Sequence, residues 1–193
     1  MIILICIVIG LALRAVTGRS LRGLAESRLR GESLLLILLI SQAALPFLQL
    51  TGAAGRVAFF VWLGTFPCMV TVAWMNRREP GMPMLGIGLL LNLVVIATNG
   101  GMPVFEVAVH TAGASAQTMT VPAGDFVHVA GSAATLLSWL GDIIPLVGPA
   151  WLRIVASPGD LLLFAGIVAF VGSTAPRARR SPSILSANES RRP

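Results

Sequence analysis

The sequence predicts an all-α integral membrane protein with about five transmembrane helices and an outer loop that is partly helical and either interfacial or re-entrant. Composition is the first observation, because 55% of the residues are hydrophobic and 11% are charged, whereas soluble domains are about 25% charged. A soluble fold of 193 residues could not cover its surface with 14 basic and 8 acidic side chains. Soluble enzymes, disordered chains and coiled coils are therefore excluded.

Apolar segments are the second observation, since five of them approach the ~20 residues that a transmembrane helix needs. The first contains Arg14, whose side chain we expect to reach the membrane interface. Its positive charge follows the apolar run, which favours an uncleaved anchor over a signal peptide. The second segment should kink at Pro46, and the third contains Pro67. The five predicted spans are residues 2–16, 34–50, 57–75, 82–98 and 161–173.

The placement of the arginines is the third observation. If the chain crosses five times, twelve arginines share one side, and only Arg56 and Arg153 fall on the other. Basic residues concentrate on the cytoplasmic side of membrane proteins, which places the N-terminus outside and the C-terminus in the cytoplasm. Residues 1–174 would form the membrane domain, and residues 175–193 a disordered, basic cytoplasmic tail. The twelve are Arg14, Arg19, Arg22, Arg28, Arg30, Arg77, Arg78, Arg177, Arg179, Arg180, Arg191 and Arg192.

The outer region, about residues 100–157, is longer than a plain connection, and long loops are often functional. We expect a short extended stretch within residues 102–109 and a short helix over residues 132–139. Residues 143–155 are apolar but interrupted by Pro145, Gly148 and Pro149, which is typical of an interfacial or re-entrant segment. Trp139 and Trp151 suit the headgroup level of a bilayer.

The fourth span carries Gly81, Gly88, Asn92 and Asn99 on one stripe of a helix. One interpretation is a packing seam, because small residues let helices approach closely and amides bond across the contact. The other places Asn92 on a polar cavity. After Asn99, the pair Gly100 and Gly101 indicates either a tight helix exit or backbone amides that approach a ligand.

Two acidic residues of the outer region stand next to apolar segments. The residues from Ser157 to Asp160 fit a capping box, with Asp160 as a structural cap that could also belong to an outer site. Asp142 precedes apolar residues and needs a partner, and Arg153 is one candidate.

Other chemistry finds little support in the sequence. His110, His128, Glu106 and Asp125 match no metal-binding spacing, so we expect no metal, no cofactor and no catalytic residue. Cys6 and Cys68 lie in apolar runs and form no framework. We expect no binding of nucleic acid, because the positive charge suits orientation in the membrane and contact with anionic lipid.

Three stretches carry a resemblance to a known family. They are residues 89–104 (LLLNLVVIATNGGMPV), 140–145 (LGDIIP) and 157–163 (SPGDLLL). The chain resembles, over about residues 1–174, the bacterial membrane family catalogued as domain of unknown function 5317. The resemblance implies a membrane topology in the bacterial inner membrane and supplies no catalytic residues.

The leading functional hypothesis is binding of a lipid-like ligand, a membrane-protein partner or a second copy through the outer face, with the bilayer as the constant partner. One alternative is a small-molecule transporter or channel subunit. Another is an enzyme acting on lipid headgroups, with Asp142 or Asp160 as acid or base. The predicted site is a shallow cavity, walled by Trp139 or Trp151, that prefers a polar or cationic group. The candidate ligand-binding residues are Asn92, Asn99, Gly100, Gly101, Asp142 and Asp160.

Overall fold

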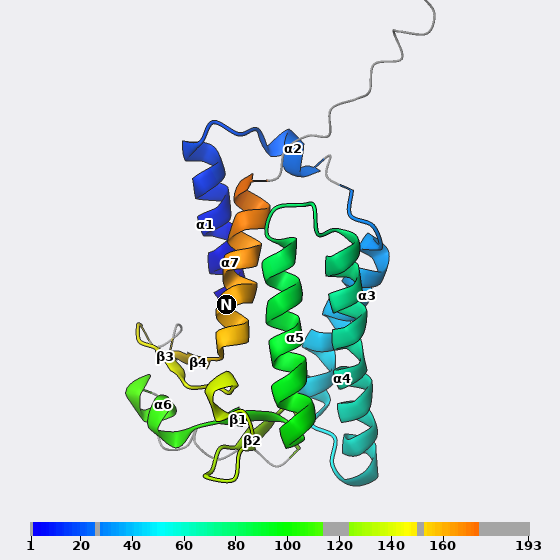
Figure 1. The fold of residues 1–193 in the computed structure, drawn as a ribbon, viewed down its shortest axis with the longest axis vertical. Helices are drawn as coiled ribbons and strands as arrows, with labels where there is room; N and C mark the ends of the chain where they lie inside the picture. Colours follow the sequence, from blue (N-terminus) through cyan, green and yellow to red (C-terminus); the bar gives the residue numbers. More distant parts are fainter. Residues whose placement is uncertain (1, 26–27, 114–123, 150–152, 174–193) are drawn as a thin grey trace, which may run out of the picture.

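The computed structural model describes residues 2–25, 28–113, 124–149 and 153–173. Five helical segments lie side by side in the order α1, α7, α5, α4, α3, each in contact with its neighbours (Figure 1). The prediction of a mostly helical chain is confirmed. The predicted tail, residues 175–193, lies outside the described residues. The segments are α1 Ile2–Val16, α3 Glu32–Ala44 continued by the 3-10 helix η1 Leu45–Leu48, α4 Gly52–Met75, α5 Met82–Asn99 and α7 Pro158–Ser173.

Local sequence explains where these helices begin and end. Gly81 and Gly100 flank α5 with φ angles of 79° and 71°, which is the left-handed region that glycine adopts without strain. The chain tightens into η1 at Pro46, where the sequence predicted a kink. By length and apolar composition, α4 and α5 could each cross a membrane, whereas α1, α7 and the combined α3–η1 segment are shorter apolar helices.

The bundle has two different ends (Figure 1). The arginine-rich end, which we define as the described residues within 17–31 and 76–81, carries the short helix α2 Leu21–Ala25. The loop end, defined as the described residues within 100–157, carries the helix α6 Glu106–Thr111 and four short strands. Asn76 joins the two turns of the arginine-rich end, because its Oδ1 accepts from the Arg30 amide at 2.8 Å and its Nδ2 donates to the Arg30 carbonyl at 2.9 Å.

Arg14 is buried inside the protein, at the arginine-rich end of α1. Only 1% of Arg14 is exposed. Its Nη1 donates to the carbonyl oxygen of Val171 at 2.8 Å, and its Nε and Nη2 donate to that of Ser20 at 3.0 and 2.8 Å. Carbonyl oxygens at the ends of helices have no partner within the helix. The guanidinium therefore ties the end of α1 to the end of α7.

The loop end corrects the all-α expectation. Strand β1 Met102–Val104 pairs in parallel with β2 His128–Ala130, and β3 Ile144–Leu146 pairs antiparallel with β4 Ile154–Ala156. The proline and glycine interruptions of residues 143–155 therefore accompany a small sheet, with residues 150–152 outside the described part of the chain.

The short helix expected over residues 132–139 is also wrong. Residues 133–137 form turns, and only Ser138–Leu140 makes a 3-10 turn, called η3. Leu137 has a φ of 52°, which a right-handed helix does not contain. The side chain of Asn99 holds both the amide and the carbonyl of Leu136, at 2.9 Å each. The Leu136 amide and carbonyl therefore bond to the side chain of Asn99 and do not form the hydrogen bonds of a local helix.

Candidate functional site

The glycine and asparagine stripe of α5 faces α7. A Cβ atom added to Gly88 would lie 2.6 Å from the Gly159 carbonyl oxygen and 3.1 Å from Leu163 Cγ. At Gly81 an added Cβ would collide with the Gly166 carbonyl oxygen. Such approach of two backbones is available only to glycine. The interpretation of the stripe as a packing seam is confirmed for Gly81, Gly88 and Asn92.

Asn92 connects this seam to the start of α7. It is 5% exposed, its Nδ2 donates to Asp160 Oδ1 at 2.8 Å, and its Oδ1 accepts from Ser157 Oγ at 3.0 Å. The capping box is also present, since the Asp160 amide donates to Ser157 Oγ at 3.0 Å and the Ser157 amide to Asp160 Oδ2 at 3.1 Å. These four bonds form a closed network that fixes the register of α7 against α5.

Asp142 is the exception in an otherwise satisfied region. It is 7% exposed, and its Oδ1 has no hydrogen-bond partner among the described residues. Its backbone is held by the Pro103 carbonyl, which accepts from the Asp142 amide at 2.8 Å. Burial, and then the negative charge of Asp160, raise the pKa of the Asp142 carboxyl to about 8. The neutral acid therefore predominates at pH 7.

The pairing of Asp142 with Arg153 does not form. Arg153 donates instead to the carbonyl oxygens of Gly148 at 3.1 Å and Gly113 at 3.2 Å. A guanidinium can satisfy itself on turn carbonyls without entering an apolar region.

Asn99, Gly100 and Gly101 lie at the exit of α5. Asn99 is occupied by Leu136 and by the Val95 carbonyl, to which its Nδ2 donates at 2.8 Å. The amides of Gly100 and Gly101 both donate to the Ile96 carbonyl oxygen. The structure thus brings Asn92 and Asp160 together with Asp142 nearby. The polar groups at the exit of α5 form hydrogen bonds within the protein instead. A ligand-binding role for these six residues stays a prediction.

A cavity of about 320 Å³ lies elsewhere at the loop end, between the α3–η1 segment, α4 and the start of β2. The sequence did not single out this set of residues, because each comes from a separate segment and is unremarkable alone. Its lining contains both apolar and polar residues. Its lining is Gln42, Pro46, Phe47, Gln49, Trp62, Asp125, Val127 and His128.

Trp62 is the most buried polar group of this cavity. The residue is 5% exposed, and its buried indole Nε1 finds no hydrogen-bond partner in the part of the chain that the structure describes. Its ring packs edge-on against Phe66 and Phe126, with centroids 5.1 and 6.4 Å away. A buried indole N–H normally finds an acceptor. The Trp62 ring forms a buried, apolar part of the cavity wall.

Asp125 supplies a negative charge at the cavity. Its Oδ2 lies 2.8 Å from His128 Nδ1, and its Oδ1 accepts from the amides of Val127 and His128 at 2.8 and 3.1 Å. Burial opposes ionisation, but the hydrogen bond and charge of His128, together with the two amides, hold the pKa of Asp125 below its usual value. Asp125 is therefore an anion at neutral pH. The other acid–imidazole pair, Glu106 with His110 on α6, is separated by 3.7 Å and largely exposed.

The comparisons with known proteins agree with the resemblance seen in the sequence. An uncharacterized protein of Thermotoga maritima is 31% identical over 126 residues, which cover 65% of this chain and 62% of that relative. The match therefore spans less than two thirds of the relative's length. No solved structure matches the chain. The model of a family described as a family of unknown function (DUF5317) matches residues 26–172. The chain belongs to this family.

Proposed function

We propose that the chain is a multi-pass protein of the bacterial inner membrane that binds an amphiphilic, lipid-like ligand at its outer, loop end. The chain would cross five times, with the N-terminus outside and the C-terminus in the cytoplasm. Supporting this, large apolar side chains project outward from α1, α3, α4 and α5, each more than half exposed. A soluble monomer rarely exposes so many. They include Ile3, Leu4, Val8, Leu36, Ile37, Leu39, Ile40, Val57, Phe60, Val61 and Ile87.

The asymmetry of the two ends supports the orientation. The arginine-rich end contains the turns of Arg19, Arg22, Arg30 and Arg77, whereas the loop end carries Arg153 as its arginine. Cytoplasmic loops of membrane proteins carry the excess of arginine. The loop end would then face outward, where it could receive a ligand from the outer leaflet.

The cavity that combines apolar side chains with the Asp125 carboxylate is the observation that carries the binding function. Ligand sites are typically apolar with a few fixed polar groups. The Asp125 carboxylate would attract a cationic group of the ligand. Phe47, which is 86% exposed beside the cavity, and the Trp62 ring would contact the apolar part. The ligand class is thus an amphiphile whose head carries an ammonium.

Titration of the purified protein with a short-chain phosphatidylethanolamine tests this function through tryptophan fluorescence. We expect saturable binding that weakens by about tenfold or more in Asp125→Asn, because a hydrogen bond to a charged group contributes ~1.5–3 kcal/mol. Trp62→Phe should weaken binding less, since phenylalanine keeps an apolar ring in the cavity wall. Because this variant lacks the fluorescence of Trp62, its affinity for the lipid is measured by calorimetry.

Glu106→Gln is the matched control, because Glu106 is an exposed acid of the same end that does not line the cavity. Its affinity should equal that of the unaltered protein. Equal loss of affinity in Glu106→Gln and Asp125→Asn would show that the ligand responds to the general surface charge and not to the cavity. Absence of saturable binding would contradict the proposal that the cavity binds this class of ligand.

A further inference from the structure

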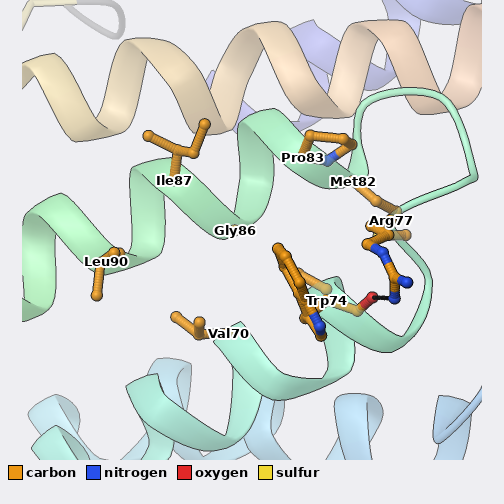
Figure 2. A pocket seen from close by; sticks show the side chains of 9 residues that line it. Val70, Trp74, Arg77, Met82, Pro83, Gly86, Ile87 and Leu90 are labelled. Atoms are coloured by element: carbon orange, nitrogen blue, oxygen red, sulfur yellow. Dashed lines mark hydrogen bonds between the residues drawn. The ribbon is translucent and has the colours of Figure 1, made fainter.

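A second hollow, of about 380 Å³, lies at the opposite end of the bundle from the cavity of Trp62. It is a groove between the last turns of α4 and the first turns of α5 (Figure 2). Figure 2 shows the Trp74 ring standing between the two helices, with Arg77 beside it. The groove is almost entirely apolar apart from Arg77. Its lining is Val70, Ala73, Trp74, Arg77, Met82, Pro83, Gly86, Ile87 and Leu90.

Small residues open this groove. Gly86 has no side chain, and a Cβ added there would be in ordinary contact with Ala73 Cβ at 3.4 Å. Around this floor, Trp74 is 67% exposed, Ile87 52% and Leu90 47%. The groove runs along two helices that are long and apolar enough to cross a membrane. Its shape and apolar lining therefore suit a linear hydrocarbon chain.

A positive charge stands at one end of the groove. The guanidinium of Arg77 lies 4.9 Å from the Trp74 ring centroid, and its Nη1 donates to the Trp74 carbonyl at 3.2 Å. A single bond of this kind leaves most of the five guanidinium donors available. The ring and the carbonyl hold the guanidinium at the groove, where it can receive an anion.

The surrounding turns reinforce this charge. Asn76 holds the backbone of Arg30 next to the Arg77 turn at 2.8 and 2.9 Å, and Arg78 is exposed in the same turn. In the sequence, residues 17–31 and 76–81 contain six arginines and the two acids Glu26 and Glu79, so arginine is in excess. Basic pockets between membrane helices on the cytoplasmic side bind anionic headgroups.

We propose that this groove is a binding site for an anionic phospholipid of the cytoplasmic leaflet. One acyl chain lies along Val70, Ile87 and Leu90, and the phosphate contacts Arg77. The site requires the chain to be in a membrane, but it shares no residue with the cavity of Trp62. The ligand of the loop end and the lipid of this groove are thus bound independently.

Quenching of Trp74 by brominated lipids tests the site, because bromine on an acyl chain quenches an indole that it contacts. The full chain is reconstituted with brominated phosphatidylglycerol or brominated phosphatidylcholine at equal mole fraction. The Trp74→Phe variant, measured alongside, isolates the Trp74 signal from the other three tryptophans. We expect phosphatidylglycerol to quench Trp74 at several-fold lower mole fraction than phosphatidylcholine.

Two variants separate a specific site from a general lipid annulus. Arg77→Gln should reduce the preference for phosphatidylglycerol about fivefold, the factor expected for one basic residue near an anionic lipid. Gly86→Leu, which fills the groove without changing charge, should reduce quenching by both lipids. Arg56→Gln, at the start of α4, is the control and should change neither.

Three results would overturn the proposal. They are equal quenching by the two lipids in the unaltered protein, an unchanged preference in Arg77→Gln, and an equal loss in Arg56→Gln. Melting of each variant in detergent, compared with the unaltered chain, shows that it is folded. Because the groove and the cavity of Trp62 are tested with different lipids and different residues, failure at one does not imply failure at the other.

Discussion

Replacing Gly88 by alanine tests whether the α5–α7 seam organises the fold. The added Cβ would lie 2.6 Å from the Gly159 carbonyl oxygen, 3.1 Å from Leu163 Cγ and 3.2 Å from Leu162 Cβ. The nearest of these atoms belongs to the backbone, so it cannot move aside as a side-chain end would. The two helices must separate by about 1 Å to restore ordinary contact. Separation also stretches the bonds of Asn92 to Asp160 and Ser157, at 2.8 and 3.0 Å.

The net effect combines two terms of opposite sign. Overfilling a tight contact costs ~1–3 kcal/mol, and replacing a mid-helix glycine by alanine returns ~0.5–1 kcal/mol. Because the contact is with backbone, we expect Gly88→Ala to reduce the free energy of unfolding by ~2 kcal/mol, and Gly88→Leu by more. A change of this size lowers the melting temperature by ~4–8 °C.

Gly64→Ala provides the control for this measurement. Gly64 lies within α4, and an added Cβ there meets no atom within 4 Å. Only the helix-propensity gain remains, so its melting temperature in detergent should stay the same or rise. If Gly88→Ala melts like Gly64→Ala, the two helices are not in contact through this seam and the reasoning fails.

Two further predictions concern buried ionisable groups. The pKa of Asp142 is raised to about 8, so between pH 4 and 8 the folded state holds a proton that the unfolded state has lost. The free energy of unfolding should therefore fall as pH rises through this window, by at most ~1.4 kcal/mol per pH unit. Asp142→Asn should flatten this pH profile. An unchanged slope in that variant would show that another group causes the pH dependence. Arg14→Met should lower the free energy of unfolding by ~2–4 kcal/mol, because it leaves the carbonyls of Val171 and Ser20 without their charged donor. Detergent unfolding checks it, with exposed Arg56→Met as the comparison, and equal stability of the two variants would contradict the role of Arg14.

The helical part of the fold was predictable because its signals are local. Apolar runs extend over many residues, and glycine, proline and asparagine mark their limits, as at Gly81 and Gly100 around α5. The capping box was equally readable, because all of its parts lie within the four residues from Ser157 to Asp160. The family followed from short stretches in and beside these helices.

The loop end was harder to predict because its contacts are distant in sequence. Strand β1 is three residues long, too short for a periodic pattern, and Met102 finds its partner at His128. The helical pattern around Leu136 is overridden by Asn99, which lies 37 residues away. Charge complementarity alone suggested Arg153 for Asp142, but backbone carbonyls satisfy Arg153 first.

The cavity of Trp62 and the groove of Trp74 were not predicted from the sequence for the same reason. Trp62, Gln42 and Asp125 belong to three segments, and each has an ordinary structural explanation when taken alone. The groove of Trp74 depends on small residues at Ala73 and Gly86, which a sequence pattern does not distinguish from other helix contacts. Only their arrangement in space joins an apolar cavity to a carboxylate, or an apolar groove to a guanidinium.

Cysteine labelling in cells tests most directly the central claim that the loop end of a membrane-embedded bundle faces outward. The background is the full chain with Cys6→Ala and Cys68→Ala, to which Ala133→Cys at the loop end or Arg78→Cys at the arginine-rich end is added. Both positions are exposed. With a membrane-impermeant maleimide, Ala133→Cys should label in intact spheroplasts and Arg78→Cys only after lysis. Labelling of Arg78→Cys in intact spheroplasts, or protection of Ala133→Cys there, would contradict the account.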